Sequence, residues 1–232
     1  MPVSVQLLTQ FPLLQPLSRE ELEKLSKHMH LRSFARRATV LSKDASFYEL
    51  GFLVEGRLQG LDFTVDGRSV GLYFVDPGDY FGELTIVDGQ PPAEFIVAAV
   101  KSTVAFLDAE TARKVIHEHQ ELAMAVMNKL AWRIRDVMAQ RTLLSLPNPF
   151  QRLCVLILQL PAQKINDSAV IEHIPTHQEL AIMINASRET VTRAFQLLFT
   201  QNILLRDGNS LKIIQPNIIK DIAEGRLPPP KA

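Results

Sequence analysis

Two helices and the turn between them are encoded by Thr176-His177-Gln178-Glu179-Leu180-Ala181-Ile182-Met183-Ile184-Asn185-Ala186-Ser187-Arg188-Glu189-Thr190-Val191-Thr192-Arg193-Ala194-Phe195. Thr176 and Glu179 have the spacing of a capping box, so a helix can start at this point. Asn enters the left-handed backbone region at moderate cost, and Asn185 therefore suits a tight turn. Ser187 can cap the second helix. The stretch predicts a helix-turn-helix.

The faces of these two helices differ in character. Their apolar side chains fall on one inward side and are Leu180, Ile184, Val191, Phe195 and Leu198. Arg188, Glu189 and Arg193 point away from that side. A recognition helix presents such residues to base edges, where Arg pairs with guanine and Glu accepts from cytosine. Alternatively, Glu189 and Arg193 form an ordinary surface salt bridge at i,i+4.

Length and composition bound the class of protein. The chain has 232 residues, of which 47% are hydrophobic, so it can bury ordinary cores and is long enough for two domains. No stretch approaches the roughly 20 apolar residues of a membrane span, and no charged leader precedes an apolar core at the N-terminus. We therefore expect a soluble cytoplasmic protein without membrane contact. The formal net charge is 0, so a whole-chain basic signature for nucleic acid is missing.

The N-terminal half reads as a helix followed by short strands. Ser18-Arg19-Glu20-Glu21 is a second capping box, and Leu22, Leu25 and Met29 give the following helix an apolar face. From Leu31 to about Leu107 short β-like runs alternate with turn signals such as Asp66-Gly67 and Pro77-Gly78-Asp79. The runs are 52–54, 70–75, 95–97 and 104–107. Many short strands at this spacing predict an antiparallel barrel or sandwich.

A glycine-led corner lies between two of these runs. It reads Tyr80-Phe81-Gly82-Glu83-Leu84 and is followed by Gly89-Gln90-Pro91-Pro92-Ala93-Glu94. A glycine turn that opens a short helix can present amides to a phosphate, and a nearby carboxylate can bind a ribose hydroxyl. The alternative is a simple corner between strands.

A long helix is predicted from about Ala109 to Leu144, because this stretch contains neither proline nor glycine. Residues at alternating steps of four and three form a heptad seam, namely Ala123, Met127, Leu130, Ile134, Val137, Arg141 and Leu144. The seam predicts a parallel helix pair in a homodimer, with Met127, Leu130, Ile134 and Val137 at its interface. Leu122, Val126 and Met138 lie beside the seam and are expected to pack on the strand domain. The alternative is an ordinary core helix inside one domain.

The C-terminal part begins with a break at Ser145-Leu146-Pro147-Asn148-Pro149, since proline cannot continue a helix. A helix from 150 to 160 and a short strand from 171 to 174 precede the helix-turn-helix. A hairpin follows it, with strands at 203–205 and 211–214. Two helices backed by a hairpin make a winged helix. Residues 228–232 are predicted to be a mobile tail.

This order of parts resembles the Crp/Fnr family of bacterial transcription regulators over nearly the whole chain. The most specific match is Ser187-Arg188-Glu189-Thr190-Val191-x-Arg193, and Phe81-Gly82-Glu83-Leu84 is similar to the opening of the family's phosphate-binding cassette. The resemblance implies an α+β protein. Its parts are a β-roll effector domain with an N-terminal helix (1–108), a dimerisation helix (109–145), a hinge (146–149), a winged helix-turn-helix (150–224) and a flexible tail (225–232).

The resemblance also implies the DNA contacts. Arg188, Glu189 and Arg193 would read half-sites of an inverted repeat similar to TGTGA-N6-TCACA, about 34–36 Å apart. His177 and Gln178 would contact phosphates, and Thr176, Ser187 and Thr190 complete the expected DNA-binding set. RNA polymerase is an expected partner by resemblance.

The cyclic-nucleotide site departs from the family pattern. Members that bind cAMP follow Gly-Glu-Leu with an Arg-Ser or Arg-Thr pair, and here those positions are Pro92 and Ala93. The hydroxyls of the long helix that contact the adenine are replaced by Val137 and Met138. A buried anion without its Arg partner loses its main compensation. We therefore predict no tight cAMP binding and regard Gly82, Glu83 and Leu84 as a remnant of the pocket, with the effector unknown.

Other sensor chemistries fit poorly. The single cysteine, Cys154, lies in an apolar run and is expected in the core, so it cannot hold an iron–sulfur cluster or form an internal disulfide. Pro2 and histidines can ligate haem iron, but no histidine lies between His30 and His117. The pairs His28/His30 and His117/His119 are at i,i+2, which on helices point to different sides, so no metal site is predicted.

The leading interpretation is a homodimeric, sequence-specific regulator of transcription that binds double-stranded DNA and is not an enzyme. One rival is a regulator gated by cAMP or another small molecule, and a second is an effector-independent regulator. A third is a ligand-binding module whose winged helix contacts protein instead of DNA.

Overall fold

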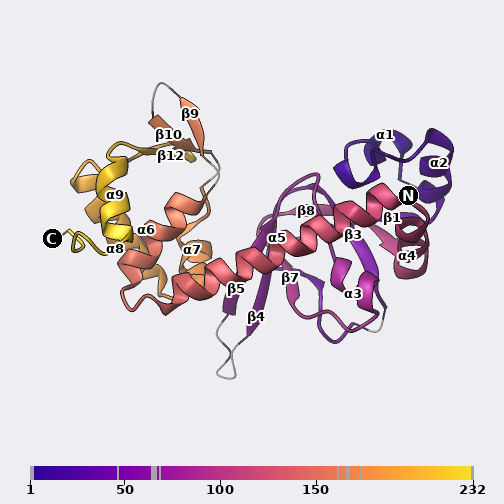
Figure 1. Ribbon diagram of the computed structural model, residues 1–232, viewed down its shortest axis with the longest axis horizontal. Coiled ribbons are helices and arrows are strands. Elements are labelled where there is room, and N and C mark those ends of the chain that lie inside the picture. Colours follow the sequence, from indigo (N-terminus) through magenta and orange to yellow (C-terminus); the bar gives the residue numbers. More distant parts are fainter. Residues whose placement is uncertain are drawn as a thin grey trace. The chain divides into compact units, whose positions relative to one another are not determined.

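The computed structural model describes residues 3–45, 47–63, 67, 69–160, 162–165, 168–172 and 174–230 (Figure 1). The chain divides into two compact units, which are Met1–Arg68 with Leu72–Asp136, and Ser69–Gly71 with Val137–Ala232. Some residues of the sequence interpretation lie outside the described part, namely Met1, Pro2, Asp66, Lys231 and Ala232.

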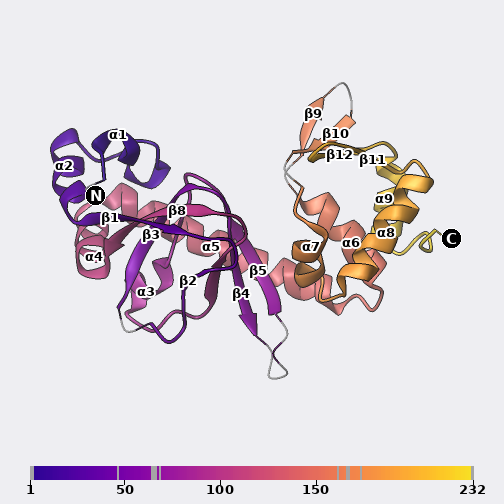
Figure 2. The ribbon, with the colours of Figure 1, turned by 180° about the vertical axis from the view of Figure 1, so that it is seen from behind.

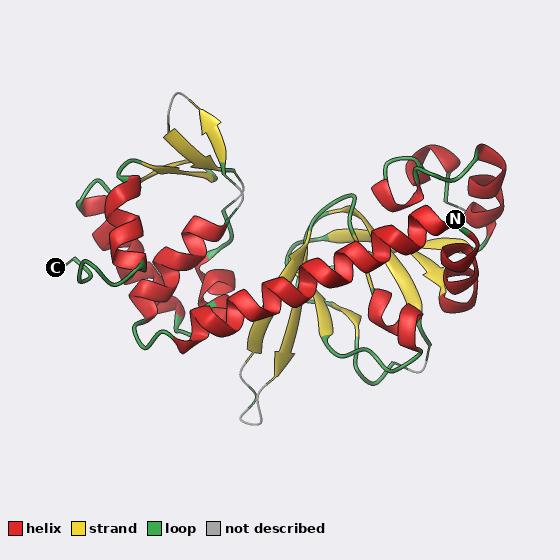
Figure 3. Cartoon of the chain, in the orientation of Figure 1, coloured by secondary structure: helices red, strands yellow, loops and turns green. Residues whose placement is uncertain are grey.

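Two four-stranded sheets built from antiparallel pairs form the centre of the first unit (Figures 2 and 3). The first sheet has the order β1-β8-β3-β6, with strands Met29–Phe34, Ser102–Asp108, Glu49–Glu55 and Tyr80–Phe81. The second has the order β2-β7-β4-β5, with strands Thr39–Leu41, Phe95–Ala98, Leu58–Phe63 and Ser69–Val75. The predicted antiparallel domain of an α+β fold is confirmed.

Strand β8 contributes to two separate cores. Ala105 and Leu107 belong to the core between the first sheet and the helices, whereas Val104 and Phe106 belong to the core between the two sheets. Successive side chains of a strand point to opposite faces, so this sheet is buried on both sides. This explains why the run from 104 to 107 is continuously apolar instead of alternating.

Short helices cover the first sheet. They are α1 (Val5–Leu8), the 3-10 helix η1 (Pro12–Leu14), α2 (Arg19–Lys27), α3 (Glu83–Asp88) and α4 (Ala109–Glu118). The capping box of α2 is confirmed, since the Ser18 amide donates to Glu21 Oε2 at 2.7 Å. Leu22 and Leu25 are buried as expected, but Met29 does not lie on the helix. It is the first residue of β1 and is buried there.

The helix predicted from 109 to 144 is not continuous, and the prediction is wrong at His119. Helix α5 spans Gln120–Ser145, and extended backbone at His119 (φ −122°, ψ 107°) separates it from α4. Ile116 of α4 and Leu122 of α5 are both buried in the same core. Six residues of unbroken helix would place them about 240° apart around one axis. The break lets both side chains reach that core.

Helix α5 buries one face from its N-terminal half. Leu122 and Val126 are buried in the helix-side core, as expected. Met138 is 63% exposed, so the prediction that it packs on the strand domain is wrong. Beyond Val126, two charged side chains follow on the same buried stripe, namely Lys129 after three residues and Arg133 after four more.

The second unit is a winged helix-turn-helix. Its helices are α6 (Pro149–Gln159), α7 (His177–Met183), α8 (Arg188–Thr200) and α9 (Pro216–Ala223). Its sheet has the order β11-β12-β10-β9, with strands Leu204–Asp207, Ser210–Ile213, Ser168–Ile171 and Gln163–Ile165. The predicted wing hairpin is confirmed, and Gly208 takes the left-handed conformation in its turn (φ 56°).

Three features of this unit differ from the sequence interpretation. The strand expected at 171–174 ends at Ile171, where it pairs with Leu211 of β12. Strand β9 and helix α9 were not predicted. The C-terminal segment is tied to α9, because the amides of Arg226 and Leu227 both donate to Asp221 O.

The break before α6 and the buried cysteine agree with expectation. Helix α5 ends at Ser145, and Asn148 caps α6 by accepting a hydrogen bond from the Phe150 amide at 2.9 Å. Cys154 is buried in α6, and burial raises the pKa of its thiol to about 12.

Candidate DNA interface and effector cassette

The turn between α7 and α8 is made by Asn185. Its backbone is left-handed (φ 48°), and the next amide, that of Ala186, donates to Ala181 O at 2.9 Å. Arg152 of α6 holds the turn from outside, since Nη2 donates to Asn185 O at 3.2 Å while Nη1 donates to Leu146 O at 2.8 Å. The turn is therefore connected to the segment that joins α5 and α6. Sequence reasoning did not identify Arg152.

Both helices begin with the predicted caps. The Thr176 amide donates to Glu179 Oε2 at 2.6 Å, and the Thr176 hydroxyl accepts from the Glu179 amide. At α8, Ser187 Oγ accepts from the Thr190 amide at 3.1 Å. These bonds satisfy the first amides of the helices and fix where each helix starts.

The outward side of α8 carries the predicted reading residues. Val191, Phe195 and Leu198 are buried, whereas Arg188, Glu189 and Arg193 are exposed. The pKa of Glu189 is lowered first by its own backbone amide and by Ser187, and only then by Arg188 and Arg193. Its carboxylate is thus held mainly by the start of the helix. Arg193 also contributes to this shift, and the ordinary Glu189–Arg193 surface pair stays an alternative prediction.

His177 is held against α8 by two contacts. Its ring stacks on Phe195 with centroids 4.8 Å apart and planes nearly parallel. Its Nδ1 lies 2.9 Å from Thr192 Oγ1, and that hydroxyl donates to Arg188 O. Because the hydroxyl proton is already used, Nδ1 carries the proton in this bond and Nε2 is the free nitrogen. Gln178, the next residue, is exposed.

The charge state of His177 follows from its surroundings. Burial lowers the pKa of its imidazole, and the positive charges of Arg206 and Arg188 lower it further. The ring is therefore neutral near pH 7 in the free protein. Thr192 and Arg206 act on this site, although Thr192 is the unspecified position of the recognition-helix motif and Arg206 carries no sequence signal.

In the first unit, the glycine-led corner has the predicted form. Gly82 is left-handed (φ 87°), and a Cβ there would lie 2.7 Å from Glu49 O, so only glycine fits. Glu83 begins α3 and is completely buried, whereas Leu84 is half-buried. Farther along, Pro92 is buried and Ala93 is exposed. We call residues 82–94 the cassette.

Arg133 of α5 fills the polar centre of the cassette. Its Nε lies 2.8 Å from Glu83 Oε1 and its Nη1 lies 3.2 Å from Glu94 Oε1. The guanidinium stacks on Tyr73 at 3.8 Å from the ring centroid, and the Tyr73 hydroxyl donates to Glu94 Oε1. Burial alone would lower the pKa of Arg133, but Tyr73 and the two carboxylates outweigh it and raise that pKa. The group is a buried cation between two buried carboxylates.

Lys129 repeats the same arrangement one turn earlier on α5. Its Nζ donates to Asp79 Oδ1 and to Tyr80 O, and it lies 3.8 Å from the centroid of the Tyr80 ring. Burial lowers the pKa of this ammonium group, while Asp79 opposes that effect. Sequence reasoning missed Lys129, Arg133, Tyr73 and the role of Glu94. The spacing of Leu122, Val126, Lys129 and Arg133 along one helical face was the available signal.

The seam residues remain uncovered in the single chain. Met127 is 53% exposed, Ile134 is 58% exposed and Val137 is 64% exposed. Leu130 is partly buried against the helix-side core. Val137 and Met138, which stand in place of the adenine contacts, are exposed and belong to the second unit.

Neither histidine pair lies on a single helix. His30 belongs to β1, where its ring stacks on Phe106 and its Nε2 lies 3.5 Å from Glu49. His119 lies in the break between α4 and α5 and contacts Glu21 at 3.1 Å. Across the described residues, no group of three or more His, Cys, Asp or Glu side chains is arranged to hold a metal ion.

Two family models match the chain. Residues 31–119 match the cyclic nucleotide-binding domain, and residues 151–222 match the Crp-like helix-turn-helix domain. The chain belongs to the Crp/Fnr family. It is a DNA-binding transcription regulator of the Crp/Fnr type, and that family consists of regulators and not of enzymes.

Similar proteins agree with this membership in the Crp/Fnr family. The cAMP-activated global transcriptional regulator CRP of Pasteurella multocida is 24% identical over 196 residues, covering 83% of this chain and 93% of that protein. The cyclic AMP receptor protein of Thermus thermophilus is 22% identical over 214 residues, which cover 92% of this chain and 97% of that protein. The structure of FixK2 from Bradyrhizobium japonicum has a TM-score of 0.70 at 18% identity, and the match covers 84% of this chain and 96% of that one. The structure of a CooA mutant from Carboxydothermus hydrogenoformans has a TM-score of 0.73 at 16% identity, and the match covers 85% of this chain and 88% of that one.

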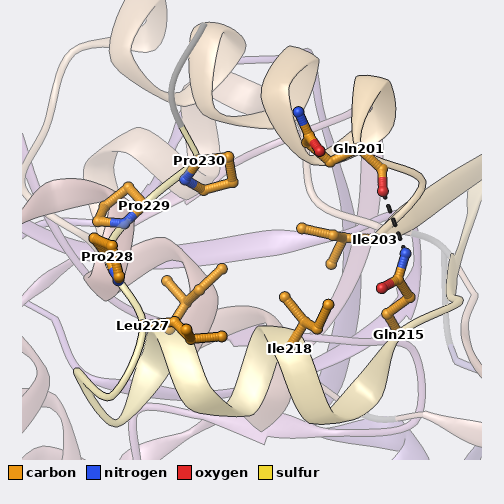
Figure 4. A pocket seen from close by; sticks show the side chains of 9 residues that line it. Gln201, Ile203, Gln215, Ile218, Leu227, Pro228, Pro229 and Pro230 are labelled. Atoms are coloured by element: carbon orange, nitrogen blue, oxygen red, sulfur yellow. Dashed lines mark hydrogen bonds between the residues drawn. The ribbon is translucent and has the colours of Figure 1, made fainter.

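This Crp/Fnr member also has a groove in its second unit (Figure 4). Its volume is about 580 Å³, and Leu227 and three consecutive prolines form one side of it. On the other side Gln215 Nε2 donates to Gln201 O at 3.2 Å. No helix within the described residues is long and apolar enough to cross a membrane.

Proposed function

We propose that this Crp/Fnr member acts as a homodimer on an inverted repeat similar to TGTGA-N6-TCACA. The observation that carries the proposal is the outward side of α8, where Arg188, Glu189 and Arg193 are exposed beyond a capped helix start. Such residues at the start of a recognition helix match guanine and cytosine edges in the major groove. His177 and Gln178 would contact phosphates, and Thr176, Ser187 and Thr190 lie beside them.

The dimer part of the proposal rests on α5. Met127, Ile134 and Val137 expose apolar side chains at heptad spacing, and Leu130 lies between them on the seam. Exposed apolar residues in a continuous row indicate a surface that another chain covers. A second copy of α5 is the partner that a heptad seam fits. The dimerisation helix would then begin at Gln120, after the break, and Leu146–Asn148 would serve as the hinge.

We further propose that cAMP does not gate this protein. The relatives from Pasteurella multocida and Thermus thermophilus are a cAMP-activated regulator and a cyclic AMP receptor protein, but Pro92 and Ala93 of this chain supply no charge for a cyclic phosphate. The buried cation that is present, Arg133, is already paired with Glu83 and Glu94. A cyclic phosphate entering the cassette would meet those two carboxylates. Another effector, or none, fits the cassette better, and RNA polymerase is the expected protein partner.

Fluorescence anisotropy tests the proposal on an inverted TGTGA repeat and on a scrambled duplex, at fixed salt, with and without cAMP. We expect preference for the repeat, unchanged by cAMP. Binding that requires cAMP would overturn the proposal about gating. Equal binding to both duplexes would overturn the proposed half-site and favour a winged helix that contacts protein.

A further inference from the structure

The charges at the polar centre of the cassette are paired with one another within the chain. Arg133 Nε and both Glu83 carboxylate oxygens are buried there without a well-aligned hydrogen bond, although Nε lies 2.8 Å from Oε1. Arg133 and Glu94 each expose only 11% of their side chains, and Glu83 exposes none. A buried guanidinium needs an anionic partner, because an unpaired buried charge is strongly unfavourable. Here the partner on the Nη1 side is the carboxylate of Glu94 at 3.2 Å. The guanidinium is thus already paired on the side that an external anion could use.

Tyr73 fixes Glu94 in this position. Its hydroxyl donates to the same oxygen, Oε1, that Arg133 approaches, and its ring lies under the guanidinium. Burial and the neighbouring Glu94 charge raise the pKa of Tyr73 well above its usual value, so the hydroxyl remains a donor. Gly60 makes room for the ring, since a Cβ at that position would lie 2.6 Å from it. The carboxylate is therefore held by strands and helix together.

The local charges disfavour any added anion. Three carboxylates, those of Asp79, Glu83 and Glu94, face two cations, Lys129 and Arg133. Lys129 is bound to Asp79 and to a backbone carbonyl, so it offers no replacement for Arg133. Burial raises the pKa of Glu83, so Glu94 is the carboxylate whose charge Arg133 relies on most. Removing the charge of Glu94 would free the Nη1 side of Arg133.

We propose that Glu94 is an intramolecular anion that occupies a latent phosphate-type site on Arg133. The Glu94 carboxylate of the cassette pairs with the buried Arg133 guanidinium of α5, so the chain itself supplies the anion. Helix α5 is consequently held on the first unit without a ligand. This deepens the proposed function, because it rests on a cassette that does not respond to cAMP and names the group that prevents the response.

Isothermal titration calorimetry of the full chain without DNA tests the proposal. The variants are Glu94→Gln, which keeps the shape of the side chain, and Glu20→Gln, which makes the same charge change at an exposed site on α2. Inorganic phosphate and cAMP are titrated separately, with NaCl matching the ionic strength. We expect E94Q to bind inorganic phosphate about ten- to a hundredfold more tightly than wild type, the factor of one charge-assisted hydrogen bond. E20Q should match wild type.

Two further variants locate the effect. Adding Arg133→Met to E94Q should abolish the gained binding, and Tyr73→Phe alone should give a smaller gain, because it keeps the charge of Glu94 but releases its anchor. The proposal is overturned if E94Q binds phosphate no better than E20Q, or if the gain survives loss of Arg133. A gain for cAMP beyond that for phosphate would show that the nucleoside also fits. These titrations contain no DNA, so their failure leaves the proposed operator untouched.

Discussion

Arg188 presents its guanidinium one residue inside the capped start of α8, where the Ser187 cap fixes the direction of the chain. An Arg pair with a guanine edge supplies about 1–3 kcal/mol of discrimination against the wrong base. Arg188→Ala should therefore weaken binding to the TGTGA repeat by about five- to 150-fold for each half-site, as measured by anisotropy. Binding to scrambled DNA should change less, so the preference should fall.

Arg226→Ala is the matched control for Arg188→Ala. It removes one exposed positive charge from the same unit, but Arg226 pairs with Asp221 and Glu224 beside α9. We expect the control to retain preference for the repeat. Equal losses for the two variants would indicate a general charge effect and contradict base readout by Arg188.

His177 should make the stability of the second unit depend on pH. Its pKa in the folded protein lies below the ordinary value of 6.5, because of burial and then of Arg206 and Arg188. At pH values between the folded pKa and the unfolded pKa of His177, the unfolded chain binds more protons than the folded one. The free energy of unfolding therefore rises with pH through that window and falls as the pH is lowered. The stability contributed by neutral His177 is thus fully present only above about pH 6.5.

Urea unfolding of wild type and His177→Gln at about pH 7.5 and pH 5.5 measures this effect. The advantage of wild type in free energy of unfolding should shrink at the lower pH. A difference between the two proteins that stays constant with pH would mean that His177 does not titrate in this range.

The residues that the sequence identified and those that it missed differ in where their partners lie. Arg188, Glu189 and Arg193 could be predicted because the cap and the inward face that orient them are within eight residues. Arg133 could not, since its partners Tyr73, Glu83 and Glu94 come from three distant segments. The helical spacing after Leu122 and Val126 places Arg133 on the buried face of α5, but it does not show which side chains Arg133 meets there.

At the scale of elements, the turn between α7 and α8 depends on Asn185. A branched residue in the left-handed region costs roughly 1–2 kcal/mol, so Asn185→Val should lower the free energy of unfolding by about that amount. Asn185→Gly is the control, because glycine adopts this conformation without strain. Arg152 bonds the backbone oxygen of Asn185 and is retained in both variants. Equal urea midpoints for the two variants would contradict the role of φ.

Helix α5 gives a second test at this scale. Ile134 lies on the seam and is 58% exposed, whereas Trp132 is 56% exposed but lies off the seam. Ile134→Glu places a charge inside the proposed coiled coil and should shift the protein toward monomer in analytical ultracentrifugation. Trp132→Glu should remain a dimer. A wild-type monomer, or a Trp132→Glu monomer with a dimeric Ile134→Glu, would refute the proposed seam.

Periodicity predicted elements well where one face alone decided the packing. It located α8, most of α5 and the wing hairpin. It did not reveal the break at His119. That break exists because Ile116 of α4 and Leu122 of α5 would lie on different faces of one continuous helix, yet both pack in the same core. Helix α9 had a local signal that we did not use, since Pro216 occupies its first turn and Ile219 and Ile222 face the core.

At the scale of the whole molecule, the order of parts was predictable but the order of strands was not. Each part carries its own signals of caps, turns and apolar runs. In the sheet of order β1-β8-β3-β6, Leu107 of β8 pairs with Met29 of β1 on one side and with Leu50 of β3 on the other. Such contacts between distant segments follow from packing two cores at once, which no local pattern of residues specifies.

The formal net charge of 0 means that affinity for DNA must come from local contacts instead of the field of the whole protein. Protonated His177 would add one such contact per subunit, because its free Nε2 becomes a donor only when the ring is charged. Each phosphate that is neutralised steepens the dependence of log K on log salt by about 0.9. For a dimer, lowering the pH from about 7.5 to 5.5 should steepen the slope by an amount that reaches about 1.8 when both copies of His177 are protonated in the complex.

Anisotropy titrations over a series of salt concentrations at the two pH values give these slopes for wild type and His177→Gln. The change of slope should be present in wild type and absent in the variant, so comparing the two removes the effects of other titrating groups. Acid would then strengthen the phosphate contacts while it weakens the free fold, because bound phosphate favours the charged imidazole that burial and Arg206 disfavour. Identical slopes for both proteins at both pH values would remove His177 from the phosphate contacts and leave the reading residues of α8 as the proposed source of affinity.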